Sequence, residues 1–218
     1  MFFRKCKKLV SHDKGNTFRI ILETLHQYGY HVKHKVLNAS EYGNIPQNRE
    51  RIYVVGFIEK DAYKNFEFPD PIPLTKTLKD VVDFNNKVDD KYYYTKEKYK
   101  FYDKLEEAIV RQDTLYQWRR IYVRENKSNL CPTLTANMGT GGHNEPLLLA
   151  KHGIRKLTPR ECFMLQGFPK NFILPEDMAQ SHLYKQAGNS VVVPVIKRIA
   201  ENIYKAVSAT KKEKVVNI

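Results

Sequence analysis

Apolar positions in the first part of the chain predict a helix followed by two strands. Across residues 16–29 apolar side chains recur at helical spacing and Gly29 follows the last of them; the face consists of Phe18, Ile21, Leu22 and Leu25. Residues 30–37 mix apolar and polar side chains, as a half-buried strand does. Residues 51–58, RIYVVGFI, form a nearly continuous apolar run with β-branched residues, which predicts a strand buried on both faces.

The pattern becomes irregular after Glu59. The Pro-rich segment FEFPDPIPL leads out of the first unit, and residues 83–98 are polar with no clear period. Residues 99–118 predict a helix whose apolar stripe is Tyr99, Tyr102, Leu105, Ile109 and Leu115. Residues 129–144 predict loops around a short strand, and their glycines permit unusual backbone angles.

Start and stop signals for helices reappear toward the C-terminus. Thr158 suits a helix cap, Pro159 the first helical position and Glu161 the reciprocal position of a capping box. Gly167 ends this short helix, and a final helix is expected to begin near Val192.

These elements predict an α/β fold interrupted by a smaller domain. A helix, strand, loop and strand indicate a layered α/β structure, and 42% hydrophobic residues suffice for a folded core. We expect the α/β unit to cover residues 1–68 and a small irregular domain to cover residues 69–168. A return segment over residues 169–218 then completes the α/β unit.

Composition narrows the function classes. No stretch approaches the ~18 uninterrupted apolar residues of a membrane helix, and the N-terminus lacks the features of a signal peptide, so we expect a cytoplasmic protein with no membrane partner. Three widely spaced cysteines without a CxxC pair predict reduced thiols and no metal site. The formal net charge of +13 favours a polyanionic partner; the alternative is the lysine bias of an AT-rich genome.

Three segments carry chemistry in a specific order. They are PQNRERIY at residues 46–53, RKLTPRE at 155–161 running into LQGFP at 165–169, and YKQAGNSVV at 184–192. Their order and spacing resemble the last three blocks of bacterial DNA cytosine-C5 methyltransferases of restriction-modification systems, and SHDKGNT at 11–17 and FEFP at 66–69 resemble the same family. The resemblance implies a Rossmann-like S-adenosyl-L-methionine-dependent domain interrupted by a target-recognition domain, with double-stranded DNA as partner.

The first segment supplies the expected catalytic residues. Alternate residues of an extended chain share a face, so Gln47, Arg49 and Arg51 can point the same way. The planar guanidinium fork suits a phosphate or a base edge, although two surface arginines would show the same pattern. The resemblance implies that these arginines hold an extruded cytosine and its backbone, with Arg51 on the base and Arg49 supporting either the structure or a phosphate.

The third segment supplies the expected cofactor contacts. We interpret residues 188–190 as a tight polar turn that precedes a helix and can offer backbone amides to a ligand, or else as an ordinary helix cap. The resemblance implies that Asn189, Ser190 and Val191 close over S-adenosyl-L-methionine.

The region between Phe68 and Ile154 is expected to read the DNA sequence. Residues 133–136, TLTA, followed by residues 139–143 resemble the recognition loops of the family, and the resemblance implies contacts from Thr133, Thr135, Gly141 and Gly142. Hydroxyls and close-approaching glycine backbone suit base edges and the sugar-phosphate chain. The arginines expected on phosphate or guanine are Arg119, Arg120 and Arg124, for which a solvated face is the alternative. Arg160 belongs to a block that we interpret as architectural, and it can pair with DNA phosphate or with Glu161. Met164 stands where the family usually has a basic residue, which removes one charge.

The family resemblance also implies groups that this sequence does not carry. The Pro-Cys-Gln loop, the Glu-Asn-Val strand end and the Phe-x-Gly-x-Gly turn are not present, and Arg4-Lys5-Cys6 stands where Glu-Asn-Val is expected. We therefore expect the C-terminal half of a methyltransferase, with an incomplete cofactor pocket, that depends on an N-terminal catalytic half. Two origins fit: a frame-shifted remnant at residues 1–6, or the second subunit of a two-chain enzyme. The alternatives in function are a non-catalytic DNA-binding subunit, a decayed gene product, or an RNA methyltransferase relative.

Overall fold

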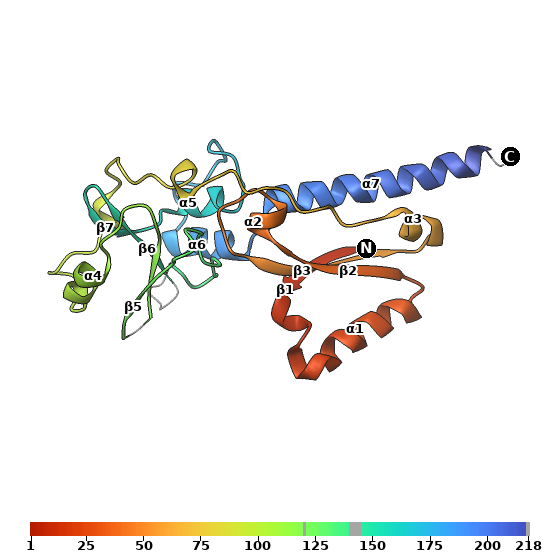
Figure 1. Cartoon of the computed structure of the whole chain (residues 1–218), viewed down its shortest axis with the longest axis horizontal. Helices are drawn as coiled ribbons and strands as arrows, with labels where there is room; N and C mark the ends of the chain where they lie inside the picture. The colour runs from red at the N-terminus through yellow and green to blue at the C-terminus, as the bar shows by residue number, and fades with distance from the viewer. Residues whose placement is uncertain (120, 140–144, 217–218) are drawn as a thin grey trace.

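Two β-sheets organise the chain into two lobes that lie side by side along its long axis (Figure 1). The computed structural model describes residues 1–119, 121–139 and 145–216. The first lobe contains β1 (Phe2–Cys6), β2 (His31–Asn38) and β3 (Glu50–Phe57), with the helices α1 (Asn16–Gln27), α2 (Ala39–Tyr42), α3 (Lys60–Asn65) and α7 (Val193–Val216). The second lobe contains β4 (Tyr116–Trp118), β5 (Val123–Glu125), β6 (Pro146–Ala150) and β7 (Gly153–Lys156), with α4 (Tyr102–Ala108), α5 (Pro159–Met164) and α6 (Gln180–Asn189).

The sheet of the first lobe has the order β1-β3-β2, and β3 is antiparallel to both neighbours. In the β1–β3 register, Arg4 lies opposite Tyr53 and Cys6 lies opposite Arg51. Because side chains alternate along a strand, these four residues share one face of the sheet. Helix α7 covers that face and α1 covers the other, as Figure 1 shows.

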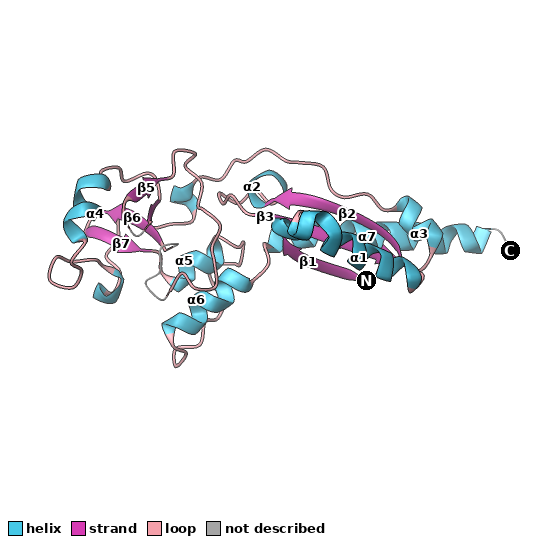
Figure 2. Cartoon of the chain, turned by 90° about the horizontal axis from the view of Figure 1, so that it is seen from below, coloured by secondary structure: helices cyan, strands magenta, loops and turns pink. Residues whose placement is uncertain are grey.

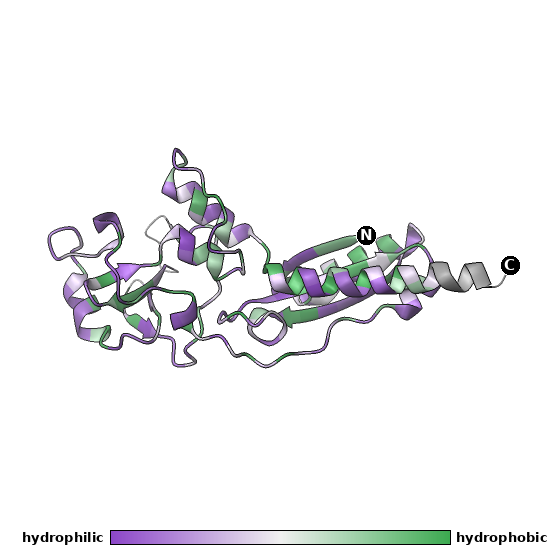
Figure 3. Cartoon of the chain, turned by 90° about the horizontal axis from the view of Figure 1, so that it is seen from above, coloured by the Kyte–Doolittle hydropathy of each residue, from purple (hydrophilic) through white to green (hydrophobic). Residues whose placement is uncertain are grey.

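The central strand β3 is the core of the first lobe. Ile52 and Val54 pack against Phe18 of α1, whereas Tyr53 and Val55 face the cluster that includes Val195 and Ile199 of α7. This burial on both faces confirms the expectation drawn from the apolar run at 51–58. In Figure 3 apolar and polar residues alternate along α7, as expected for a helix with one face on a sheet.

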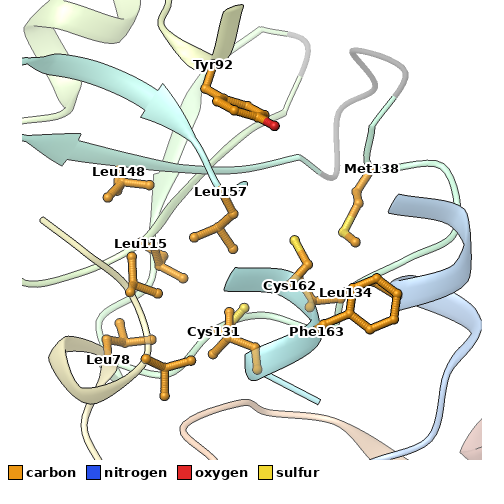
Figure 4. Packing of buried hydrophobic residues seen from close by; sticks show 14 of the residues in the cluster. Leu78, Tyr92, Leu115, Cys131, Leu134, Met138, Leu148, Leu157, Cys162 and Phe163 are labelled. Carbon is orange, nitrogen blue, oxygen red and sulfur yellow. The ribbon is translucent and has the colours of Figure 1, made fainter. Parts of the chain in front are cut away.

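The second lobe is built on an antiparallel sheet with the order β5-β4-β6-β7, seen beside the first sheet in Figure 2. Its core lies where this sheet meets α5 and the loops on either side (Figure 4). The labelled side chains there include Leu115, Leu134, Leu148, Leu157, Cys131 and Cys162, all almost fully buried. Two of the three cysteines are therefore packing residues of this core.

Helix α5 begins as its sequence predicts. The Thr158 hydroxyl accepts a hydrogen bond from the Glu161 amide at 3.2 Å, and the Glu161 carboxylate accepts one from the Thr158 amide at 2.7 Å. Pro159 occupies the first turn. Gly167 has a φ of 82° and ends the helical stretch, and α7 begins at Val193.

The helix predicted over residues 99–118 is present only in part, as α4. Helix α4 stops at Ala108, and Tyr116 to Trp118 form β4 between β5 and β6. The consecutive β-branched residues Ile109 and Val110 disfavour helix continuation, and strand pairing then captures the aromatic residues of β4. In the described part of residues 129–144 the expected short strand is reduced to one β-bridge between Gln47 and Cys131.

The segment before residue 190 also differs from the prediction. Residues 188–190 are not a turn that opens a helix: Gly188 and Asn189 end α6, and Ser190 is its C-terminal cap. Tyr184 and Ala187 of α6 pack in the core of the second lobe, so the chain rejoins the first sheet only at α7. Within the described residues, no helix combines the length and apolar character that crossing a membrane requires.

Candidate functional site

The loop before β3 joins the two lobes through Gln47. This side chain is fully buried. Its Nε2 donates to the Leu165 carbonyl at 2.6 Å, and its Oε1 accepts from the Leu134 amide at 3.4 Å. Both partners belong to the second lobe, so Gln47 fixes the loop against that lobe.

Arg49 fixes the same loop against a third segment. It is 2% exposed, and its Nη1 donates to the Leu134 carbonyl at 2.8 Å. Its Nη2 donates to the Gly188 carbonyl at 2.9 Å and to the Ser190 carbonyl at 3.1 Å. Both Nη atoms of Arg49 thus donate to carbonyl groups of the protein. Through these bonds Arg49 connects the start of β3, the second lobe and the end of α6.

The end of α6 explains why a buried cation is stable at this place. The last carbonyls of a helix have no intrahelical partner, and the helix dipole gives this end a partial negative charge. Since residues 188–190 form a C-terminal end, they present carbonyl groups and not the amides that the sequence suggested. Burial, and after it the charges of Arg51 and Arg4, together lower the pKa of Arg49 to about 9.

Arg51 stands at the start of β3 and is half-buried. Its Nη1 donates to the carbonyl of Glu50 at 2.7 Å. Burial is the main cause that lowers the pKa of Arg51; the Cys6 thiol across the strand pair opposes the shift, and Arg4 adds to it. The expected neighbourhood of the 49–51 arginines and the 188–190 segment is therefore present in the fold.

A third arginine, Arg4, lies beside Arg49 and Arg51. No role was predicted for it from the sequence. Its Nη2 donates to the Asn189 carbonyl at 3.0 Å, and its buried Nη1 has no hydrogen-bond partner within the part of the chain that the structure describes. Burial lowers the pKa of Arg4. The sequence contains one signal for this position, since Arg4 lies two residues before Cys6, as residues on one face of a strand do. Because no strand was predicted at residues 2–6, the position of Arg4 opposite Tyr53 could not be inferred.

The residues predicted to bind the cofactor surround the end of α6. Asn189 is exposed, while Ser190 and Val191 are half-buried. The Ser190 hydroxyl donates to the Ala187 carbonyl at 2.8 Å, which closes the last turn of the helix. The carbonyl of Asn189 is bound by Arg4, and its side-chain amide lies at the surface.

The residues predicted to contact DNA lie in three places. Thr133 donates its hydroxyl hydrogen to the Asn48 carbonyl at 2.7 Å, so it faces the loop before β3, and Thr135 donates to the Asn137 side chain at 2.8 Å. On the β4–β5 hairpin, Arg119 is half-buried and Arg124 is exposed. Arg160 donates to the Phe172 carbonyl and lines a cavity of about 520 Å³ together with Glu161 and Met164 of α5. The predicted residues Arg120, Gly141 and Gly142 lie outside the described residues.

The thiols differ in accessibility. Cys131 and Cys162 are buried, and burial raises the pKa of both, which keeps them as neutral thiols. Cys6 is exposed on β1 opposite Arg51. Across the part of the chain that the structure describes, no three His, Cys, Asp or Glu side chains gather to hold a metal ion.

The fold is similar to that of solved methyltransferases. A structure of the Entamoeba histolytica methyltransferase EhMeth matches 94% of this chain and 62% of its own, with 18% identity and a TM-score of 0.67. The S. pombe Dnmt2 methyltransferase matches 94% of this chain and 64% of its own, with 16% identity and a TM-score of 0.64. These similarities show that the chain shares the fold of the matched parts of both structures.

Sequence comparison narrows the class further. The chain belongs to the C-5 cytosine-specific DNA methylase family, whose model matches residues 5–205. It is 65% identical over 206 residues to the type II methyltransferase M.Bsp6I of Bacillus sp. (strain RFL6), and this covers 94% of the chain and 65% of the relative. The type II methyltransferase M.NlaX of Neisseria lactamica is 38% identical over 96% of the chain and 64% of its own length. The chain thus spans less than two thirds of the length of these relatives.

Proposed function

We propose that this chain is the target-recognition and base-holding part of a DNA cytosine-C5 methyltransferase. One observation carries the proposal: Arg49 ties β3, the second lobe and the end of α6 together through three hydrogen bonds beside Arg51. A strand fixed this firmly at the junction of two lobes holds Arg51 in one place with respect to both. Such fixed geometry is what a reactive base needs once it leaves the duplex.

The three residues of the first motif then have different roles. Gln47 and Arg49 are positioning residues, because the Nε2 of Gln47 and both Nη atoms of Arg49 donate to carbonyl groups inside the protein. Arg51 is the residue that contacts the extruded cytosine, since it is half-buried and its Nη1 has only the neighbouring Glu50 carbonyl as partner in the described ranges. The planar fork of Arg51 can donate to the carbonyl oxygen of the base.

The second lobe would read the DNA sequence. Thr133 and Thr135 lie in the segment that faces the loop before β3, and Arg119 and Arg124 lie on the β4–β5 hairpin. Arg160 with Gly141 and Gly142 completes the proposed DNA contacts. In this scheme residues 1–68 belong to the catalytic side, residues 69–168 together with α6 form the reader, and α7 returns to the first sheet.

The residues at the end of α6 fit part of an S-adenosyl-L-methionine pocket. The exposed Asn189 amide and the half-buried Ser190 and Val191 can line a polar ligand, while Arg4 and Arg49 keep the backbone around them fixed. S-adenosyl-L-methionine supplies the methyl group when it is bound. The chain contributes one wall of this pocket in the proposal.

The nucleophilic thiolate would come from a separate catalytic segment. Cys131 and Cys162 are enclosed in the core of the second lobe, where an added base could not reach them. Cys6 lies on β1, and its flanking residues do not resemble the Pro-Cys-Gln loop. We therefore propose an N-terminal catalytic half or subunit as the partner, and no methyl transfer by the chain alone.

Reconstitution tests the proposal. The chain is mixed with the N-terminal segment of the 65% identical relative, and transfer of radiolabelled methyl groups to double-stranded DNA is measured. We expect no transfer with either piece alone and transfer with both. Arg51→Ala should lower the rate of the pair by roughly a hundredfold.

The matched control is Arg19→Ala on the exposed face of α1, which should leave the rate unchanged. Transfer by the chain alone would refute the dependence on a partner. DNA binding without transfer by the pair would support the non-catalytic alternative.

A further inference from the structure

The face of the first sheet that α7 covers carries, next to the end of α6, a cluster of basic side chains around one thiol. Cys6 lies directly opposite Arg51 in the β1–β3 register, and Arg4 lies two residues before Cys6 on the same face. Tyr53, opposite Arg4, is buried between them, and burial raises its pKa while the three arginines lower it. Four polar groups from two strands therefore converge on one small area.

The charges in this area are only partly compensated. Arg49 rests on the carbonyls that end α6, and Arg4 uses Nη2 on the Asn189 carbonyl. Among the described residues, the buried Nη1 of Arg4 has no hydrogen-bond partner, and Nη1 of Arg51 has only the carbonyl of Glu50. A buried donor of a charged group destabilises the folded state when it has no hydrogen-bond partner. Arg4 and Arg51 therefore lack an acceptor.

Nearby acids do not fill this gap. The carboxylate of Glu50 pairs with Lys7, and by strand alternation Glu50 points to the α1 face, away from Arg51. The neighbours that act on the pKa values of Arg4 and Arg51 are other arginines, Tyr53 and the Cys6 thiol. Like charges thus face one another without a carboxylate between them.

We propose that Arg4 and Arg51 together hold one phosphate group over Cys6. A guanidinium fork matches the oxygens of a phosphate, and two forks from adjacent strands can each donate to it. In the proposed function, Arg51 contacts a neutral base. The site inferred here differs from that contact because its ligand is an anion and because Arg4 takes part in binding it. The phosphate can be free inorganic phosphate or a phosphodiester of DNA, and the DNA source alone rests on the proposed function.

Cys6 provides a reporter inside the site. It is the exposed cysteine, whereas Cys131 and Cys162 are buried and serve as internal indicators of folding. The full chain is treated with iodoacetamide, and the alkylation rate of Cys6 is followed by mass spectrometry. Increasing inorganic phosphate is compared with chloride at equal ionic strength, and we expect phosphate to slow labelling of Cys6 in a saturable manner.

Arg4→Gln should raise the phosphate concentration for half protection by about tenfold, the equivalent of one charge-assisted hydrogen bond. The matched control is Lys5→Gln, which removes the same charge from the opposite face of β1 and should protect like the unaltered chain. If Cys131 or Cys162 reacts in Arg4→Gln, that variant has not folded correctly, and Arg4→Lys is tested in its place. Lysine keeps the charge but has no guanidinium fork, so protection by phosphate should still be weaker. Equal protection in the Arg4 and Lys5 variants, or no difference between phosphate and chloride, would overturn the site.

A parallel titration with duplex DNA separates the two sources. Protection of Cys6 by DNA as well as by phosphate supports a phosphodiester ligand at this site. Protection by phosphate but not by DNA leaves the anion site in place and contradicts the proposed approach of DNA to Arg51.

Discussion

Arg49 donates a hydrogen bond from Nη2 to the carbonyl oxygen of Gly188 at 2.9 Å, across 139 positions of the chain. With its bonds to Leu134 and Ser190, this one side chain replaces the water that three buried carbonyls would otherwise bind. A lysine at this position has a single ammonium group and cannot match the fork geometry. We expect Arg49→Lys to lower the free energy of unfolding by about 3 kcal/mol, measured by urea denaturation.

The control for this change is Arg19→Lys. Arg19 pairs with Glu23 on the exposed face of α1, where the same substitution should shift stability by less than about 0.5 kcal/mol. Equal effects of the two substitutions would mean that the Arg49 bonds contribute no more than a surface pair.

Gly188 gives a second test of the same junction. A Cβ atom built at Gly188 would lie 2.3 Å from the backbone carbon and oxygen of Thr135, and backbone cannot move aside cheaply. Gly188→Ala should therefore push α6 away from the 133–136 segment and destabilise the chain by about 3 kcal/mol. Thermal unfolding and reactivity of Cys131, which lies in the adjoining core, both report the change.

Gly29→Ala is the comparison for Gly188→Ala. No atom lies within 4 Å of a Cβ at Gly29, but its φ of 81° strains any other residue. The expected loss there is about 1 kcal/mol, from backbone strain alone. Finding the larger loss at Gly29 would contradict the steric account of Gly188.

Local sequence signals predicted the elements whose stability is local or fully apolar. The run at 51–58 became β3, and the Thr158–Glu161 capping box opened α5 as its residues require. A capping box is satisfied within four residues, so tertiary contacts are not needed to recognise it. The same is true of a strand whose two faces are both apolar.

The misjudged elements depend on partners that are remote in sequence. Residues 116–118 form a strand because β5 and β6 pair with them, and periodicity in residues 99–118 contains no sign of that pairing. At the site, the sequence correctly predicted that the segment with Arg49 and Arg51 lies near residues 188–190. It predicted the wrong groups there, because a helix C-terminus presents carbonyls and not the expected amides. Arg4 was missed because its place depends on the β1–β3 register. The roles of these residues toward DNA and cofactor stay predictions.

Arg155 and Glu161 offer a test of a buried ion pair. Arg155 Nη2 lies 2.7 Å from Glu161 Oε1, and both side chains are almost fully buried where β7 meets α5. Arg155→Met leaves the carboxylate of Glu161 without its cation and should cost about 3–5 kcal/mol. Glu161→Gln also weakens the capping box, so its own loss includes a helix-cap contribution.

The double variant distinguishes a pair from two independent contacts. In a double-mutant cycle by urea denaturation, Arg155→Met combined with Glu161→Gln should destabilise the chain by less than the sum of the single changes, because the second change removes the unpaired charge. Strict additivity would contradict the coupling.

Glu145 predicts the direction in which stability depends on pH. Its carboxyl group is buried, accepts a hydrogen bond from the Tyr94 hydroxyl, and lies 3.4 Å from the ammonium of Lys156. Burial raises the pKa of Glu145 above the ordinary value of 4.5, and the bonds to Tyr94 and Lys156 only partly oppose this. The folded state then binds the proton more tightly than the unfolded state. The stabilisation that this provides is complete below pH 4.5 and is lost as the pH rises through the folded pKa.

Glu145→Gln should flatten this dependence, because an amide keeps an acceptor for Tyr94 and does not ionise. Urea denaturation between pH 4.5 and 7 should show the unaltered chain losing more stability than the variant, by about 1.4 kcal/mol for each unit by which the pKa is raised. Glu23→Gln on the exposed face of α1 is the control and should leave the pH profile of the unaltered chain in place. A Glu145→Gln profile parallel to that of the unaltered chain would show that this carboxyl group titrates alike in the folded and unfolded states.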